Sequence, residues 1–289
     1  MEAALPLLAL GLVVCGAVLH AFWNILAKRG ANGPLFVWAY SAISSVLYLP
    51  LVIWATATTS MRWTLLALGM VLASGVLHLG YSLALQGGYR RADLSVVYPV
   101  ARGTGPLLSV TGAVLMLGEP FGLPVAVGAG FVVAGVFLVG GGGRRAGQPL
   151  WPGVVWGVLI GLFIAAYTLN DGTAVKRLAV PPILMDYFGN LLRVVLLTPL
   201  AVRRRGELLA ELKASGRSAL GIGVLAPIPY ILSLYAMTMA PLSLIAPARE
   251  LSMMVGVVFG RVMLKERAVA TRFLGAALIL IGVIALSLG

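Results

Sequence analysis

Long runs of apolar residues, separated by short polar segments, form the pattern of this chain. About 20 consecutive apolar residues cross the core of a bilayer as a helix. Backbone groups that face lipid must be hydrogen-bonded within their own segment, which favours helices for runs of this length. The fold class predicted is an all-α membrane protein with ten transmembrane helices, at residues 4–27, 34–54, 64–86, 94–117, 121–141, 152–175, 183–202, 218–239, 242–264 and 271–288.

The second half of the chain repeats the first, with a displacement of about 147 residues. Matching positions are Arg102 with Arg249, Glu119 with Glu266, His20 with Tyr167, Asn24 with Asp171, Tyr40 with Tyr187, Gly128 with Gly275 and Gly135 with Gly282. The charged matches carry most weight, because charged residues are scarce here. Two copies of five spans must lie in opposite orientations across a membrane, as in many secondary transporters. We therefore expect two inverted five-helix repeats, 1–141 and 152–289, joined by a glycine-rich linker at 142–151.

Composition supports a membrane protein and argues against other classes. Hydrophobic residues make up 60% of the chain and charged residues 10%, against roughly 25% charged in soluble domains. We expect a multi-pass protein of the cell (inner) membrane. The net charge of +12 does not indicate nucleic-acid binding, because the basic residues lie mostly in clusters between the apolar runs. Two distant histidines and one cysteine give no metal-ligand spacing, so we expect neither a metal nor another cofactor.

The loops between spans differ strongly in charge. The odd-numbered loops contain fourteen Lys and Arg residues, whereas the even-numbered loops contain only Arg62, Lys176 and Arg177. Basic loops tend to stay in the cytoplasm. This bias predicts that both termini lie outside the cytoplasm.

Polar residues within the spans are the candidates for function, because an ionisable group at mid-bilayer needs a partner or a cavity. In the first span His20 and Asn24 share a face beside Trp23, and in the sixth Tyr167 and Asp171 occupy the equivalent positions. Two interpretations remain open for these positions. The polar pairs either line a pathway or form hydrogen bonds that hold the bundle together.

Proline interrupts the fourth and ninth spans at matching places, which is the best sequence indication of a transporter's binding site. In the fourth span Pro99 is followed by Arg102, on one stripe with Tyr98; in the ninth Pro247 is followed by Arg249 and Glu250. Both arginines are too deep to reach the interface easily. The alternative to a binding role is structural pairing, such as Arg249 with Asp171 or Arg102 with Glu250.

Other polar and small residues fit either role less clearly. His78 and Tyr81 in the third span and Tyr230 in the eighth add hydrogen-bonding surface, and we include them among the substrate-binding candidates. Asp186 and Arg193 share a face of the seventh span, which predicts packing by an ion pair. Glu119 and Glu266 end their spans and are expected to make structural contacts. Glycines of the fifth and tenth spans permit close approach of helices, either within the bundle or between two copies of a homodimer.

Four segments resemble the drug/metabolite transporter superfamily, specifically its EamA-type members with ten helices. They are HAFWNILAK, DLSVVYPVARGTGPLLS leading to LGEP, YTLNDGTAVK, and APARELSMMVG leading to LKER. The resemblance implies a central cavity lined from both halves, by His20, Asn24, Tyr98, Arg102, Tyr167, Asp171, Arg249 and Glu250. It also implies cytoplasmic termini, opposite to the orientation that the loop charges predict.

The leading hypothesis is a secondary transporter, with no catalytic residues, that exports a small polar metabolite such as an amino acid or related carboxylate. The guanidinium of Arg102 or Arg249 can grip a carboxylate with two hydrogen bonds, and Asp171 or Glu250 can carry a coupling proton. Two alternatives are a membrane-embedded enzyme acting on a lipid or quinone and a passive channel. No Ser-nucleophile signature or metal-ligand spacing favours the enzyme, and no ring of charge favours the channel.

Overall fold

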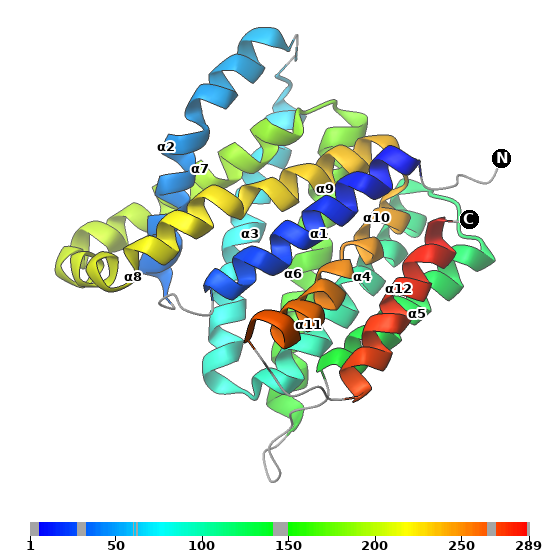
Figure 1. Ribbon diagram of the computed structural model, residues 1–289. Coiled ribbons are helices and arrows are strands. Elements are labelled where there is room, and N and C mark those ends of the chain that lie inside the picture. The colour runs from blue at the N-terminus through cyan, green and yellow to red at the C-terminus, as the bar shows by residue number, and fades with distance from the viewer. Residues whose placement is uncertain are drawn as a thin grey trace.

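The computed structural model describes residues 6–27, 33–59, 61, 63–140, 150–264 and 270–287, and every regular element in this part of the chain is a helix. Figure 1 shows a bundle in which the start of α1 and the end of α12 lie at the same side. The helices are α1 (Leu7–Ala27), α2 (Pro34–Thr58), α3 (Leu65–Arg91), α4 (Leu94–Leu117), α5 (Leu123–Gly140), α6 (Leu150–Arg177), α7 (Pro182–Arg203), α8 (Arg205–Leu225), α9 (Pro227–Met239), α10 (Leu242–Ala248), α11 (Leu251–Leu264) and α12 (Ala270–Ser287).

The predicted span 218–239 is wrong at its start and is not one helix. Helix α8 already begins at Arg205, because the charged segment ahead of residue 218 is rich in Leu, Ala, Glu and Lys, which are good helix formers. A second helix, α9, begins at Pro227. Proline lacks the backbone N–H that would continue α8, whereas it is well tolerated in the first turn of a new helix.

The predicted span 242–264 is also broken, into α10 and α11, by a turn at Arg249 and Glu250. Pro247 has no backbone N–H to donate, which weakens the helix just before the turn. The N–H of Glu250 bonds to the carbonyl of Pro247 at 3.0 Å, and the N–H of Met253 to that of Glu250 at 2.8 Å. Bonds to the third residue back tighten a helical turn. The break therefore gives the side chains of Arg249 and Glu250 separate directions.

The bounds of the helices repeat with the same displacement as the sequence. Leu123–Gly140 and Ala270–Ser287 differ by 147 residues at both ends. In the same way α3 corresponds to α8 with α9, and α4 to α10 with α11. The equivalent prolines differ in effect, because α4 continues through Pro99 whereas α10 ends after Pro247.

Helices of the two halves pack mainly against each other. Helix α1 packs on α9 and α11, α6 packs on α3 and α4, and α2 packs on α7 and α8. Figure 1 shows α5 and α12 side by side at one side of the bundle, with α2, α7 and α8 at the other. This interdigitation brings polar residues from both halves into the middle of the molecule.

Glycines bring α5 and α12 into backbone contact. A Cβ added to Gly135 would lie 2.5 Å from the carbonyl oxygen of Gly275, and one added to Gly128 would lie 2.8 Å from that of Gly282. Along these contacts the residue numbers rise in α5 as they fall in α12, so the two helices are antiparallel. These glycines therefore serve contacts within the chain.

We expect Gly135→Ala to lower the melting temperature of the purified protein, because the added methyl group meets backbone that cannot move aside. Overpacking of this kind costs about 1–3 kcal/mol. Gly130→Ala in the same helix is the matched control, since nothing lies within 4 Å of its added Cβ. Equal melting temperatures for the two variants would show that the α5–α12 contact is not tight.

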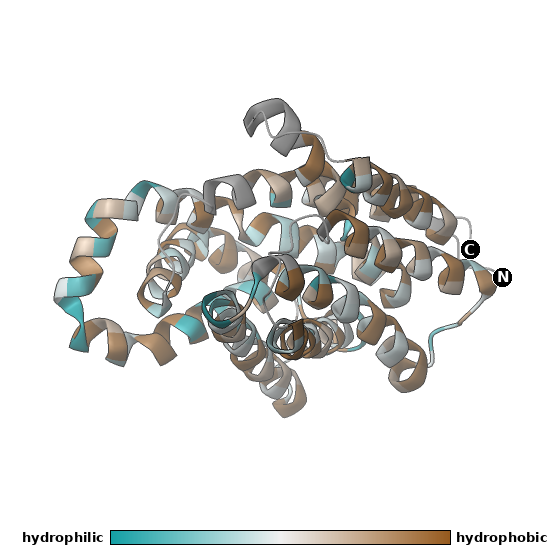
Figure 2. Ribbon diagram, turned by 90° about the horizontal axis from the view of Figure 1, so that it is seen from below, coloured by the Kyte–Doolittle hydropathy of each residue, from teal (hydrophilic) through white to brown (hydrophobic). Residues whose placement is uncertain are grey.

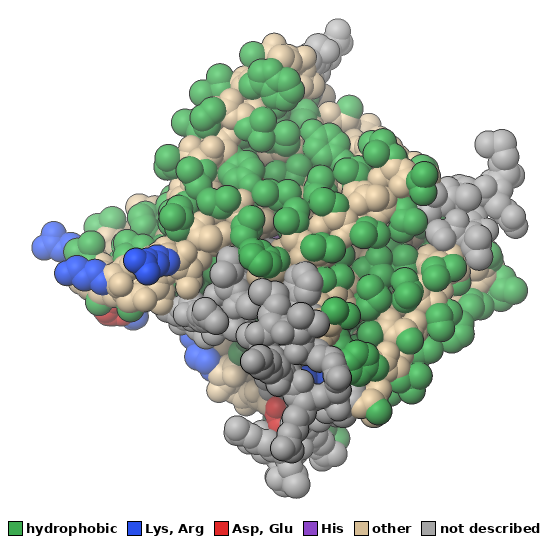
Figure 3. Space-filling model, viewed as in Figure 1, with side chains coloured by type: hydrophobic (Ala, Val, Ile, Leu, Met, Phe, Trp, Pro, Cys, Tyr) green, Lys and Arg blue, Asp and Glu red, His purple; other side chains and the backbone are tan. Residues whose placement is uncertain are grey.

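The surface is apolar and several of the charges are inside. Figure 3 shows hydrophobic side chains over most of the visible face. Leu65 and Leu115 are 88% and 78% exposed, whereas Asp171 and Glu250 are 0% and 3% exposed. Six of the described helical stretches are long and apolar enough to cross a membrane, and three more are apolar but shorter. This is the distribution of a multi-pass membrane protein.

Candidate functional site

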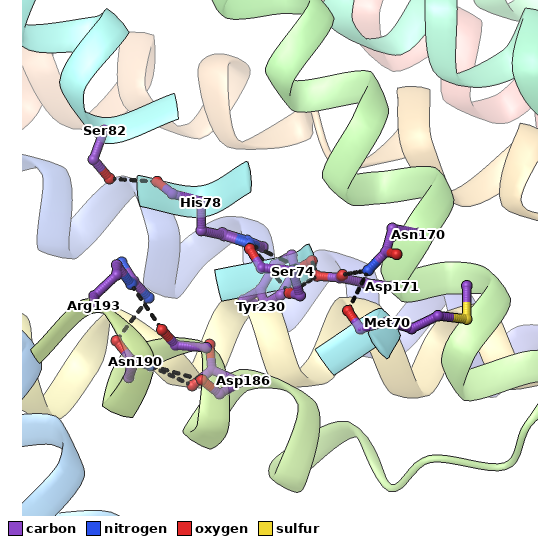
Figure 4. Close-up of polar contacts among 11 residues, drawn as sticks. Met70, Ser74, His78, Ser82, Asn170, Asp171, Asp186, Asn190, Arg193 and Tyr230 are labelled. Atoms are coloured by element: carbon purple, nitrogen blue, oxygen red, sulfur yellow. Dashed lines mark hydrogen bonds and ion pairs between the residues drawn. The ribbon is translucent and has the colours of Figure 1, made fainter. Parts of the chain in front are cut away.

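Three helices surround the carboxylate of Asp171 on α6. Ser74 Oγ donates a hydrogen bond of 2.9 Å to its Oδ2, and Asn170 Nδ2 donates one of 2.8 Å to its Oδ1. The hydroxyl of Tyr230 on α9 also donates to Oδ2, and His78 Nδ1 lies 3.8 Å from this oxygen. Figure 4 shows these residues together. We refer to them as the Asp171 cluster; neutral donors supply its hydrogen bonds.

Aromatic rings line one side of the Asp171 cluster. His78 stacks on Tyr167 with ring centroids 4.2 Å apart. Tyr81 and Tyr230 each meet Tyr167 edge to face, at 5.7 and 5.9 Å. The third, sixth and ninth helices of the structure thus bring together four of the predicted binding residues.

Arg102 on α4 is the centre of a second group. Its Nη1 donates to Glu250 Oε1 at 3.3 Å and its Nη2 donates to Ser252 Oγ at 3.3 Å. The same Nη2 lies 3.4 Å from His20 Nε2, and the guanidinium lies 5.7 Å from the ring of Tyr98. We call these five residues the Arg102 cluster. Its ion pair joins the two halves of the chain inside the membrane.

Arg249 is held differently from Arg102. Its guanidinium lies over the ring of Tyr230, 5.4 Å from the centroid. The guanidinium makes no hydrogen bond or ion pair with a described residue. An arginine side chain carries five N–H donors. Because Tyr230 also bonds to Asp171, one tyrosine connects the buried carboxylate with this arginine.

The sequence left two structural pairings open, and only one of them forms among the described residues. Arg102 pairs with Glu250. Asp171 is satisfied by the Asp171 cluster, and Arg249 is not among its partners within 4.0 Å. The equivalent arginines of the two halves therefore have different roles in the structure.

Comparison with known proteins gives the family. Residues 151–288, from the start of α6 to the end of the chain's last helix, match the model of the EamA-like transporter family. This match covers a little less than half of the chain. The resemblance to the drug/metabolite transporter superfamily is thereby confirmed. One solved structure, described only as "Crystal structure of protein", aligns with a TM-score of 0.75 at 16% identity, covering 97% of this chain and 98% of that chain. This likeness shows the fold alone. No curated protein matched the chain.

Among the predicted binding residues in or beside the two clusters, the EamA-like half supplies Tyr167, Asp171, Tyr230, Arg249 and Glu250, and the first half supplies the others. Two predicted residues of the first half stay without a description: Trp23 and Asn24 lie on α1, in a stretch whose side chains fall outside the described residues. The other ten predicted residues all lie in or beside the clusters. Whether they bind a substrate stays a prediction.

Sequence reasoning missed three polar members of the clusters: Ser74, Asn170 and Ser252. Two of them carried a readable signal, since Ser74 precedes His78 by one helical turn and Asn170 adjoins Asp171. Ser252 carried none, because its approach to Arg102 depends on the turn between α10 and α11. Serine is common in membrane helices and rarely stands out by itself.

The predicted ion pair on α7 is mediated by a third residue. Asn190 Nδ2 donates to Asp186 Oδ2 at 2.9 Å, and Arg193 Nη2 donates to Asn190 Oδ1 at 2.7 Å. Among the described residues Asp186 and Arg193 do not pair directly within 4.0 Å. Residues 186 and 193 are two helical turns apart, and the amide at position 190 fills the intervening turn (Figure 4).

Glu119, in the loop between α4 and α5, caps α10 of the EamA-like half. Its carboxylate oxygens accept hydrogen bonds of 2.8 Å from the backbone N–H groups of Leu242 and Ser243, and Lys176 Nζ lies 3.3 Å away. Burial alone would raise the pKa of Glu119, but these bonds and the ammonium bring the pKa below its ordinary value of 4.5. The structural role expected for Glu119 is thus borne out. Glu266 lies outside the described residues.

We expect Glu119→Gln to lower the melting temperature at neutral pH, by the loss of about 1 kcal/mol of capping energy. A carboxylate whose pKa falls on folding stabilises the protein above its unfolded pKa, and this contribution is lost as the pH falls through the folded pKa. The gap between wild type and variant should therefore close as the pH falls below 4.5. Glu207→Gln, at an exposed carboxylate, is the control. A gap independent of pH would contradict the capping role.

Beside the Asp171 cluster, a groove of about 560 Å³ opens between α3 and α6. Its lining is apolar except for one residue: Leu65, Leu66, Gly69, Met70, Ala73 and Asn170. This lining lacks the residues expected for the central cavity. Within the described residues, no group of three or more His, Cys, Asp or Glu side chains is placed to hold a metal ion.

Proposed function

We propose that the chain is a secondary transporter of the cell (inner) membrane that exports an amino acid or related carboxylate by alternating access. The family match supports a transporter. The observation that carries the substrate class is Arg249, a guanidinium inside the membrane region that has an aromatic contact but no described carboxylate within 4.0 Å. Arginine matches a carboxylate with two parallel hydrogen bonds. A substrate carboxylate would supply the missing partner.

Alternating access requires two halves that can move against each other. We infer that residues 1–141 and 152–289 are repeats in inverted orientation. The antiparallel contact of the equivalent helices α5 and α12 supports this, because equivalent helices of inverted repeats run in opposite directions. The reciprocal packing of α1 on α9 and of α6 on α3 supports it as well. The tight glycine contact would then be the part of the bundle that moves least.

Asp171 is a better site for a coupling proton than Glu250. Glu250 is paired with Arg102, and a buried ion pair holds both of its charges. Asp171 accepts hydrogen bonds from Ser74, Asn170 and Tyr230, none of which is a cation. Gain of a proton by Asp171 would release the Tyr230 hydroxyl, and the ring of this tyrosine carries Arg249. Tyr230 is therefore the residue through which proton and substrate sites would communicate.

Transport by the purified protein in liposomes tests these steps. A panel of radiolabelled amino and hydroxy acids is offered with and without a pH gradient. We expect one class to be taken up, with a rate that depends on the gradient in wild type and not in Asp171→Asn. Tyr230→Phe keeps the ring under Arg249 and loses the hydroxyl, so it should retain substrate binding and lose the gradient dependence. Wild-type flux that ignores the gradient would exclude the proton role.

A further inference from the structure

The turn from α7 into α8 is the most basic part of the described surface. Arg203, Arg204 and Arg205 are consecutive, and Lys213 and Arg217 follow on α8; all five are exposed. Among these five residues, Arg204 alone has an ion-pair partner within 4.0 Å in the described part of the chain, Glu207 at 3.6 Å. Figure 3 shows these Lys and Arg side chains gathered at one end of the molecule. This end is opposite the start of α1.

Basic and apolar side chains share one exposed side of α8, and acidic side chains lie on another. At 100° per residue, Arg205, Leu209 and Lys213 follow one another at four-residue intervals along one side, and Leu220 continues it. Leu209 and Leu220 are 58% and 51% exposed. The carboxylates of Glu207 and Glu211 lie on a different side of the helix. We call the exposed side with its cations and leucines the basic stripe of α8.

Another side of α8 fixes the helix to the bundle. Leu208, Ala219 and Ile222 are buried in a cluster with Leu35 and Phe36 of α2. The start of α8 is seen nearly end-on at the left of Figure 1, and in Figure 2 the same region runs across the end of the bundle. The free side of α8 therefore lies at one end of the bundle.

We propose that the basic stripe of α8 binds anionic phospholipids, with Arg205, Lys213 and Arg217 on the headgroup phosphates and Leu209 and Leu220 against the acyl chains. Basic residues beside a membrane attract anionic headgroups, and amphipathic helices bury their apolar side at the same boundary. Basic residues such as Arg90 and Arg91 can be explained by the retention of positive charge on one side of the membrane. That preference explains only the positive charge of α8. It does not account for leucines placed on the same side as the cations.

Thermal unfolding of the full-length protein in neutral detergent tests the proposal, because a ligand of the folded state raises the melting temperature. The additives are phosphatidylglycerol, phosphatidylcholine and inorganic phosphate. We expect phosphatidylglycerol to raise the melting temperature of wild type most. Lys213→Gln/Arg217→Gln should weaken its affinity about thirty-fold, given the typical contribution of each basic residue at an anionic surface.

The matched control is Arg90→Gln/Arg91→Gln, which removes the same charge from the last turn of α3 and should keep the wild-type response. Equal responses to both lipids, or an equal loss in both double variants, would overturn the proposal. A response to inorganic phosphate as large as that to phosphatidylglycerol would show a site for free anions and no lipid site. Native mass spectrometry gives a second readout: the α8 variant should retain fewer phosphatidylglycerol molecules than the control. Equal retention would also overturn the proposal.

Discussion

Arg249→Ala is expected to abolish transport while leaving the melting temperature close to that of wild type. The guanidinium has no hydrogen bond or ion pair among the described residues, so its removal breaks none there. A substrate carboxylate would lose both charge-assisted hydrogen bonds, and truncation of one partner of a desolvated charge pair costs about 2–5 kcal/mol. Uptake into liposomes checks the loss of transport, and thermal unfolding of the same preparation checks the melting temperature.

Arg249→Lys tests whether substrate binding needs only the positive charge at this position or also the planar guanidinium. It keeps the cation over Tyr230 but cannot form the two-pronged contact, so we expect binding to be weakened and not lost. The exposed Arg90→Ala serves as control and should transport like wild type. Wild-type transport by Arg249→Ala would exclude this arginine from the substrate site. A collapse of its melting temperature would instead assign it a structural role.

The spans could be predicted from sequence because hydropathy reports the lipid environment directly. Eight of the ten expected spans are single helices in the structure. The two breaks could not be predicted, since proline does not decide them alone: α4 continues through Pro99 and Pro106, whereas α10 ends after Pro247. The start of α10 could not be predicted locally either, because the Glu119 carboxylate, from the loop between α4 and α5, satisfies its first backbone N–H groups.

The contrast between the two arginines, in hindsight, is encoded in the sequence. Glu250 directly follows Arg249, and the equivalent position after Arg102 is Gly103. Among the described residues, the carboxylate of Glu250 pairs with Arg102, across the break between α10 and α11. Arg249 has no counterpart carboxylate in the first half. The repeat gives the two arginines equivalent positions, but the residue that follows them differs, Gly103 in the first half and Glu250 in the second.

The ion pair of Arg102 leads to the opposite expectation from Arg249. Glu250 is 3% exposed and its Oε2 is buried without a hydrogen-bond partner in the described part of the chain. Its other oxygen depends on Arg102. Arg102→Met should therefore leave an uncompensated buried charge and destabilise the protein by about 3–5 kcal/mol. Loss of folded protein would then account for loss of transport.

The double variant Arg102→Met/Glu250→Leu shows whether the unpaired charge of Glu250 causes the loss of stability in Arg102→Met. Replacing both partners of a buried ion pair with apolar residues is often neutral or stabilising, because the desolvation cost of both charges disappears. We expect the double variant to recover most of the melting temperature that Arg102→Met loses. Each protein is unfolded thermally in the same detergent, with Glu250→Leu completing the cycle. If the double variant melts as low as Arg102→Met, the contacts of Arg102 with Ser252 and His20 hold α4 in place, and the ion pair is secondary.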